Sequence, residues 1–249
     1  MTPMPMKTIP FIVALSALAA QAAMQLPAPQ STSVPLVRAT VKIDGVLDEQ
    51  VWDKVPRLTP FVHHDSMAPA RVTTEARIWY DESALYVGWI CGDTDIQATF
   101  TERDSRFWEE EVVEFFVTPG PLDRYFELQW NPLGGTFDAI IANTIAPDGQ
   151  SAGIKGDWSF TASNMTYAVQ VSGSVQNSSD RDERWTVEAR IPFSDLKVST
   201  PRNGDVWRGN FYRFNRDRGA EPEELSWSPT VWKGFHQPNR FGYLRFGGE

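Results

Sequence analysis

Trp108 and Glu114 lie close together near the middle of the chain, and their residue types suggest a binding site. The residues around Glu114 alternate as in a β-strand, where successive side chains point to opposite faces. Val113, Phe115 and Val117 therefore share one face, and Glu114 lies on the other. A flat indole can cover the C–H face of a sugar ring, and a fixed carboxylate accepts hydrogen bonds from its hydroxyls. The alternative is a core tryptophan beside a solvated glutamate.

Further polar residues are expected on the same face of the sheet. The range 124–131 alternates as a strand whose polar side includes Glu127 and Gln129, and a Pro/Gly turn suggests that it pairs with the strand of Glu114. Arg213, in a later strand, could join this face. These side chains suit bidentate hydrogen bonds to neighbouring hydroxyls. An ordinary solvated sheet face is the alternative.

The composition limits the classes of function. A net charge of −9 argues against a nucleic-acid partner, which would require a basic surface. Three His and one Cys make a zinc site unexpected, and Cys91 is interpreted as a buried thiol. Ten Trp fit a binding surface rich in aromatic rings, although cores use tryptophan too.

The first 22 residues have the pattern of a secretory signal. Lys7 precedes an apolar run that is too short to span a bilayer, so no transmembrane segment is expected. A small-x-small pattern ends at Ala22, and cleavage is expected near it. The sequence therefore predicts a secreted or periplasmic protein.

One domain is expected after the signal. Residues 23–37 are interpreted as a flexible leader and residues 38–249 as an all-β domain, an antiparallel, jelly-roll-like β-sandwich with one short helix near 48–54. Long loops are expected at 146–157 and 216–238. The strands are expected at 41–43, 74–80, 84–91, 111–118, 124–131, 136–143, 166–175, 184–191, 206–215 and 241–246.

An ordered set of motifs resembles the family 9 carbohydrate-binding modules and their stand-alone relatives over roughly residues 40–247. The motifs are IDGVLDEQVW (43–52), LYV (85–87) before DTD (93–95), RD (103–104) before Trp108, VEFF (113–116), WTVEARIP (185–192) and FGYL (241–244). The resemblance implies a non-catalytic β-sandwich that grips sugar ends, often derived from xylan or cellulose, and supports carbohydrate catabolism.

The same resemblance implies a clamp of two tryptophans above polar residues. Trp108 and Glu114 match the first tryptophan and its glutamate by spacing. The second tryptophan is expected from a late loop, where Trp227 and Trp232 are both available and Trp232 is favoured. Glu127 stands where the family often has an arginine, a difference that bears on sugar specificity and on whether sugar binding is retained.

The resemblance also implies structural calcium in some members. The acidic residues Asp93 and Asp95 offer the oxygen ligands that calcium prefers. Solvated acidic turns in a chain of negative net charge are the alternative.

Two other functions stay open, and the oligomeric state is not predicted. The first is a glycoside hydrolase that uses Glu114 and Glu127 as acid and base. The second is a scaffold, or a haem-type redox subunit of the same fold, that has lost sugar binding. Met and Lys hold the iron in such relatives, and no clear pair stands out here. His63 and His64 are adjacent, so on a strand their side chains would point to opposite faces.

Overall fold

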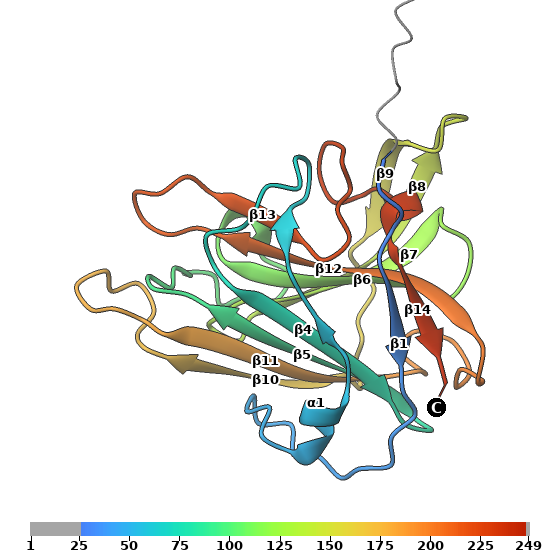
Figure 1. Ribbon diagram of the computed structural model, residues 1–249, viewed down its shortest axis with the longest axis horizontal. Helices are drawn as coiled ribbons and strands as arrows, with labels where there is room; N and C mark the ends of the chain where they lie inside the picture. The colour runs from blue at the N-terminus through green and yellow to red at the C-terminus, as the bar shows by residue number, and fades with distance from the viewer. Residues whose placement is uncertain (1–25, 248–249) are drawn as a thin grey trace, which may run out of the picture.

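The computed structural model describes residues 26–247, which form strands in two packed sheets (Figure 1). The larger sheet has the order β1 (Ser31–Val34), β14 (Gly242–Phe246), β12 (Val206–Asn215), β6 (Val112–Thr118), β7 (Arg124–Trp130), β8 (Thr136–Ile145) and β9 (Ser151–Asp157). β13 (Glu223–Ser226) pairs with β12, and β3 (Val62–His63) pairs with β13. The second sheet has the order β10 (Thr166–Ser172), β11 (Arg184–Pro192), β5 (Ala84–Gly92), β4 (Thr74–Tyr80) and β2 (Arg57–Leu58). The predicted β-sandwich is confirmed.

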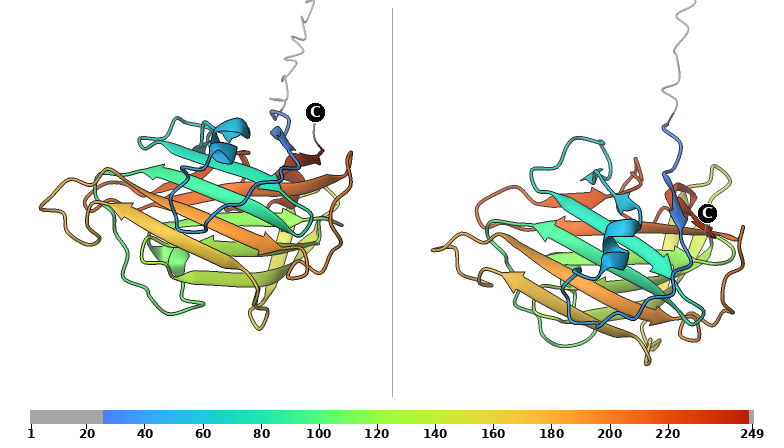
Figure 2. Two further views of the ribbon diagram at one scale, coloured as in Figure 1. Left: turned by 90° about the horizontal axis from the view of Figure 1, so that it is seen from below. Right: turned by 60° about the horizontal axis from the view of Figure 1, so that its bottom comes forward.

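The main core lies between the two sheets, which Figure 2 shows from two further directions. The alternation predicted for β6 is confirmed, since Val113, Phe115 and Val117 all join this core. Leu128 and Trp130 of β7 pack against them from the neighbouring strand. The opposite side chains of β6 and β7 therefore lie on the outer face of the larger sheet.

That outer face is not a plain solvated surface. A second apolar cluster covers part of it and includes Val112 and Phe116 of β6, Tyr125 of β7, Phe137 of β8 and Tyr212 of β12. The short helix η1 (Phe107–Glu109) and the segment before η2 (Pro238–Arg240) pack on it as well. Polar residues on this face are consequently held in an apolar setting.

The predicted helix is present as α1 (Gln50–Lys54). Trp52 is buried with Trp79 and Tyr86, so the helix packs on the outer face of the smaller sheet (Figure 1). The indole N–H of Trp52 donates a hydrogen bond of 3.1 Å to Glu188 of β11.

The structure differs from the sequence-based expectations in several segments. Residues Ser31–Val34, expected in a flexible leader, form β1 and pair in parallel with β14 because Val34 is fully buried there. Residues 41–43 form no strand, whereas the two expected long loops contain β9 and β13. The predicted signal at residues 1–22 lies outside the described residues. Within residues 26–247, no helix combines the length and hydropathy needed to cross a membrane.

Candidate functional site

A cavity of about 480 Å³ opens on the outer face of the larger sheet. Side chains from β6, β7, β8, β9, β12 and β13 line it, together with η1 and the segment before η2. Its walls are largely aromatic and its polar groups are few, which is the usual make-up of a small-ligand site. The lining residues are Trp108, Glu114, Glu127, Phe137, Ile141, Ile154, Gly156, Trp158, Phe214, Glu224, Gly234, Phe235 and His236.

Trp108, which is predicted to bind the sugar, lies in the wall of the cavity. It belongs to η1, whose first residue Phe107 is fully buried and anchors the turn. Its ring meets Phe137 edge-to-face at a centroid distance of 5.7 Å. Arg216 donates a hydrogen bond of 3.4 Å to the carbonyl oxygen of Trp108. The indole is thus held from both the sheet and the backbone side.

A second tryptophan, Trp158, lines the same cavity and was missed in the sequence. It follows β9 directly, and its ring meets Trp108 at 6.1 Å with an interplanar angle of 74°. Gly156 makes room for it, because a Cβ atom there would lie 2.4 Å from the indole nitrogen of Trp158. The two rings are edge-to-face and do not form a parallel clamp. Trp158 is 51% exposed, so its ring borders the mouth.

Glu114 and Glu127 meet at the base of the cavity, as the pairing of their strands predicted. Glu114 lies opposite Gln129 in the ladder, so Glu127 is its diagonal neighbour on the same face. The residues are only 2% and 6% exposed. Gln129 donates a hydrogen bond of 2.6 Å to Glu127 from a fully buried position outside the lining. No side chain or backbone group within residues 26–247 hydrogen-bonds to the Glu114 carboxylate.

Burial disfavours the charged forms of both carboxyl groups. It raises the pKa of Glu114 well above the ordinary value, and the charges of Glu127 and Glu224 add to the shift. Burial likewise raises the pKa of Glu127 to about 7, opposed in part by the hydrogen bond from Gln129. Near neutral pH the pair therefore retains protons that exposed glutamates would have lost.

A third carboxylate, Glu224 of β13, also lines the cavity and was missed because β13 was expected to be loop. His64 lies 3.4 Å from one oxygen and Arg216 lies 3.4 Å from the other. The hydrogen bond from His64 lowers the pKa of Glu224, and the charge of Arg216 acts in the same direction. His64 and Arg216 thus stabilise the negative charge of Glu224. No such basic side chain contacts Glu114 or Glu127 within residues 26–247.

Phe235 and His236 close the cavity from the segment before η2. The Phe235 ring stacks on Tyr212 at 4.1 Å, and its carbonyl oxygen accepts a hydrogen bond of 3.0 Å from the Tyr212 hydroxyl. The His236 ring lies 2.8 Å from the hydroxyl of Tyr125. Burial lowers the pKa of His236 to about 4, so its imidazole is neutral near neutral pH.

Three predicted site residues lie elsewhere. Arg213 follows Phe211 on the inter-sheet side of β12, whereas Tyr212 pairs with Glu114, so Arg213 points away from the cavity. Trp227 is 5% exposed and packs in the inter-sheet core. Trp232 is 49% exposed and lines a shallower neighbouring depression.

The two predicted calcium ligands, Asp93 and Asp95, are joined by a hydrogen bond of 2.9 Å from the Asp95 backbone to the Asp93 carboxylate, but their side chains have different further partners. Asp95 accepts hydrogen bonds from Ser178, Gln97 and the Arg218 backbone. Asp93 instead lies with Glu111 and Asp217, and these three carboxylates have oxygens within 4.8 Å of one another. Arg213 already pairs with Asp93 at 2.6 Å and lies 3.6 Å from Glu111. Arg213 thus already supplies one positive charge to this set of carboxylates.

Chelation gives a direct test of the predicted calcium. With Arg213 supplying the positive charge, we expect excess chelator to leave the midpoint of thermal unfolding unchanged. Differential scanning calorimetry with and without chelator measures this. A midpoint that falls on chelation, and is restored by added calcium, would show that these carboxylates bind a calcium ion in addition to Arg213.

The chain matches the sequence pattern of carbohydrate-binding family 9 over residues 61–246. A candidate carbohydrate-binding protein from Bacteroides uniformis has a similar structure, with a TM-score of 0.68 and 23% identity over 88% of this chain and 100% of that one. A family 9 module from Caldicellulosiruptor kristjanssonii, solved with cellotriose, has a TM-score of 0.58 and 17% identity, over 87% of this chain and 94% of that one. The structure of that module with glucose has a TM-score of 0.56 and 17% identity, over 88% of this chain and 97% of that one. No curated protein matched the chain.

Proposed function

Because the chain belongs to carbohydrate-binding family 9, we propose that the cavity beside Trp108 holds the end of a β-linked sugar chain, such as those derived from xylan or cellulose. The family binds carbohydrate without catalysis, and so does this chain. The glycoside hydrolase alternative, and the scaffold and haem-type alternatives, are therefore set aside. Cellotriose and glucose are the ligands of the structurally similar Caldicellulosiruptor module.

The cavity itself is the main support for this binding site. Its volume of about 480 Å³ falls within the roughly 300–1,000 Å³ usual for small-ligand pockets. Aromatic rings from Trp108, Trp158 and Phe137 offer apolar faces for the C–H groups of a sugar. Glu114 and Glu127 offer oxygens to its hydroxyls at the base. Apolar walls around a few fixed polar groups favour a ring that has both kinds of surface.

Replacing Trp108 with alanine tests the site. The substitution removes one apolar wall, and stacking on an aromatic side chain is worth about 1–3 kcal/mol where it is measured for nucleic-acid bases. We therefore expect the affinity for xylo- or cello-oligosaccharides to fall about ten- to hundredfold. Glu114→Gln keeps the shape and replaces the carboxyl group with an amide that still hydrogen-bonds to hydroxyls, so it should weaken binding less.

Isothermal titration calorimetry on both variants measures these changes, and circular dichroism checks the fold. Trp232→Ala is the comparison variant, because Trp232 lies outside the cavity. Unchanged affinity in a folded Trp108→Ala protein would contradict the site. A loss only in Trp232→Ala would place the ligand in the neighbouring depression.

Export is part of the same proposal. A protein that binds polysaccharide-derived chains meets them outside the cytoplasm, and the signal pattern ending at Ala22 supports this location. We expect the exported protein to begin close to residue 23. N-terminal sequencing of protein recovered from the periplasm or the medium measures the cleavage, and an intact Met1 would contradict it.

A further inference from the structure

Two buried carboxylates at the base of the cavity have no positively charged protein partner. Glu114 and Glu127 are 2% and 6% exposed, and the amide of Gln129 is the protein donor to this pair within residues 26–247. Neither Lys nor Arg appears among the lining residues. The nearby Arg216 and His64 contact Glu224 instead, each at 3.4 Å.

Such a pair favours a ligand that brings a positive charge. An ionised carboxylate that is removed from water is costly unless a cation or several hydrogen bonds compensate it. A neutral hydroxyl hydrogen-bonds to the pair but supplies no positive charge that would stabilise the ionised form. An ammonium group donates up to three hydrogen bonds and neutralises the charge as well. Charge-assisted hydrogen bonds of this kind are about twice as strong as neutral ones.

The walls of the cavity favour the same ligand. The faces of aromatic rings carry negative electrostatic potential and attract cations within about 6 Å. Phe137 and Phe235 supply such rings around the carboxylates. Arg216 and Arg106 already lie over the rings of Phe214 and Trp108, at 4.8 Å and 5.8 Å from the ring centroids. His236 is the basic residue in the lining, and burial keeps its imidazole neutral by lowering its pKa to about 4. The lining side chains themselves therefore carry no positive charge that would repel a cation.

We propose that the cavity selects a sugar unit with a protonated amine, such as a 2-amino-2-deoxyhexose, whose ammonium group lies between Glu114 and Glu127. This inference rests on the proposed carbohydrate site and names the substrate class of that site. Chains of neutral hexoses fit the same walls but supply no cation that would let the acidic pair ionise. A sugar acid is disfavoured, because its carboxylate would lie beside two acidic groups.

Binding of the amine is linked to the protonation of the pair. The carboxyls keep protons in the free protein, because burial raises the pKa of Glu114 well above normal and that of Glu127 to about 7. An ammonium group favours their ionised forms, so it releases protons from the cavity and its affinity rises with pH through this range. The other titratable or charged groups around the pair are Glu224 with His64 and Arg216, His236, Tyr125 and Tyr212.

Matched trisaccharides test the proposal by calorimetric titration of the intact protein at neutral pH. Cellotriose and the β-1,4-linked glucosamine trimer share ring and linkage, and they differ by an amine in place of the C2 hydroxyl. The N-acetylated trimer keeps the nitrogen without the charge. We expect the glucosamine trimer to bind about tenfold more tightly than cellotriose. Titration in buffers of different ionisation enthalpy should show proton release for this trimer alone.

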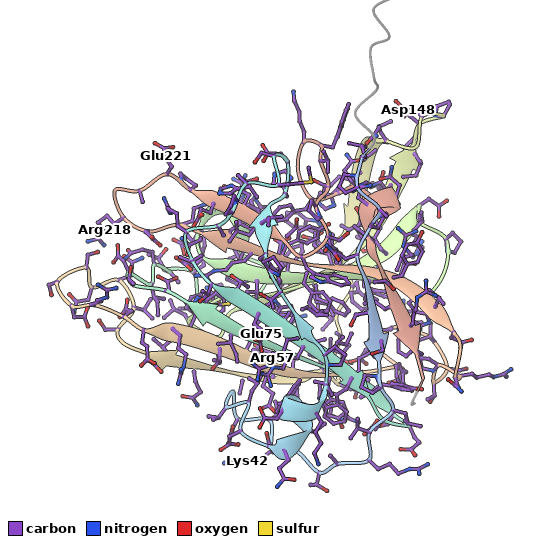
Figure 3. All side chains as sticks on the ribbon, viewed as in Figure 1. Lys42, Arg57, Glu75, Asp148, Arg218 and Glu221 are labelled. Carbon is purple, nitrogen blue, oxygen red and sulfur yellow. The ribbon has the colours of Figure 1, made fainter. Side chains whose placement is uncertain are left out.

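Three glutamine variants assign the preference to the acidic pair. Glu114→Gln and Glu127→Gln should each reduce the preference for the amine, and the double variant should abolish it. Glu221→Gln is the matched control, because Glu221 is exposed in the loop between β12 and β13 (Figure 3) and does not line the cavity. This control should keep the full preference.

The outcomes separate this inference from the proposed function. Cellotriose binding as tightly as the glucosamine trimer, or a preference that survives in the double variant, would overturn amine selectivity and leave the carbohydrate site standing. Binding of a simple linear diamine as tight as that of the glucosamine trimer would overturn the sugar class. If none of the three trisaccharides binds, the proposed carbohydrate site fails and the inference fails with it.

Discussion

Replacing Arg213 with methionine is expected to lower the free energy of unfolding by about 3–5 kcal/mol, the usual loss when one partner of a buried ion pair is removed. Arg213 is fully buried and lies 2.6 Å from Asp93 and 3.6 Å from Glu111, both also buried. It further donates hydrogen bonds to the Gly92 carbonyl oxygen and to Asn215. Methionine keeps much of the aliphatic stem but leaves two buried carboxyls without a cation.

Urea denaturation followed by tryptophan fluorescence measures this loss. Arg38→Met is the matched control, because Arg38 also lies 2.6 Å from a carboxylate oxygen, that of Glu82, but the two side chains are 79% and 58% exposed. Solvent screens such a pair, so the control should change the unfolding free energy far less. Equal losses in the two variants would contradict the role assigned to Arg213.

The contribution of Glu127 to the stability of the ligand-free protein is expected to fall as the pH rises from about 4.5 to about 7. Glu127 has an ordinary pKa of 4.5 when unfolded and about 7 in the folded protein, where burial raises it. At this residue the folded state binds more protons than the unfolded state in this window, so its contribution to the free energy of unfolding decreases with pH. His236 acts in the opposite direction, because burial lowers its pKa to about 4. For Glu127 alone the change is on the order of 3 kcal/mol. Burial acts on Glu114 in the same direction.

Glu127→Gln isolates this contribution because it removes the titrating group and keeps its shape. We expect the free energy of unfolding of the variant to increase relative to that of the wild-type protein between pH 4.5 and pH 7, since His236 titrates equally in both proteins. It should also be the more stable of the two above pH 7. Urea denaturation at a series of pH values measures both, and Glu221→Gln serves as the exposed control. Parallel pH profiles for the wild-type and Glu127→Gln proteins would show that Glu127 ionises normally in the folded state.

Much of the fold and the base of the cavity could be predicted locally. Side chains alternate along a strand with a period of two, so Phe115 and its neighbours already indicated that Glu114 points away from the core. The turn between β6 and β7 is short, so Glu127 was expected on the same face as Glu114. Trp108 was recognised by its spacing from Glu114, and the structure places it in the wall.

The sequence was ambiguous for β12. One side of this strand contains Phe211, Arg213 and Asn215, and the other contains Asn210, Tyr212 and Phe214, so each side mixes polar and aromatic residues. Only the pairing of Tyr212 with Glu114 places Arg213 on the inter-sheet side, where Asp93 and Glu111 meet it. That ion cluster joins residues far apart in the chain, and no local spacing indicates it.

Local periodicity and a short turn predict most of the central strands, the inward faces of β6 and β7, and the pair Glu114 and Glu127. The packing of the complete fold selects which aromatic residues line the cavity. Trp158 lies against Trp108 because β9 pairs at the edge of the sheet, while Trp227 is buried in the core. A tryptophan suits either place, since its large apolar ring gains from burial and from a ligand alike. Long-range packing determines that Trp227 lies in the core and that Trp158 lines the cavity.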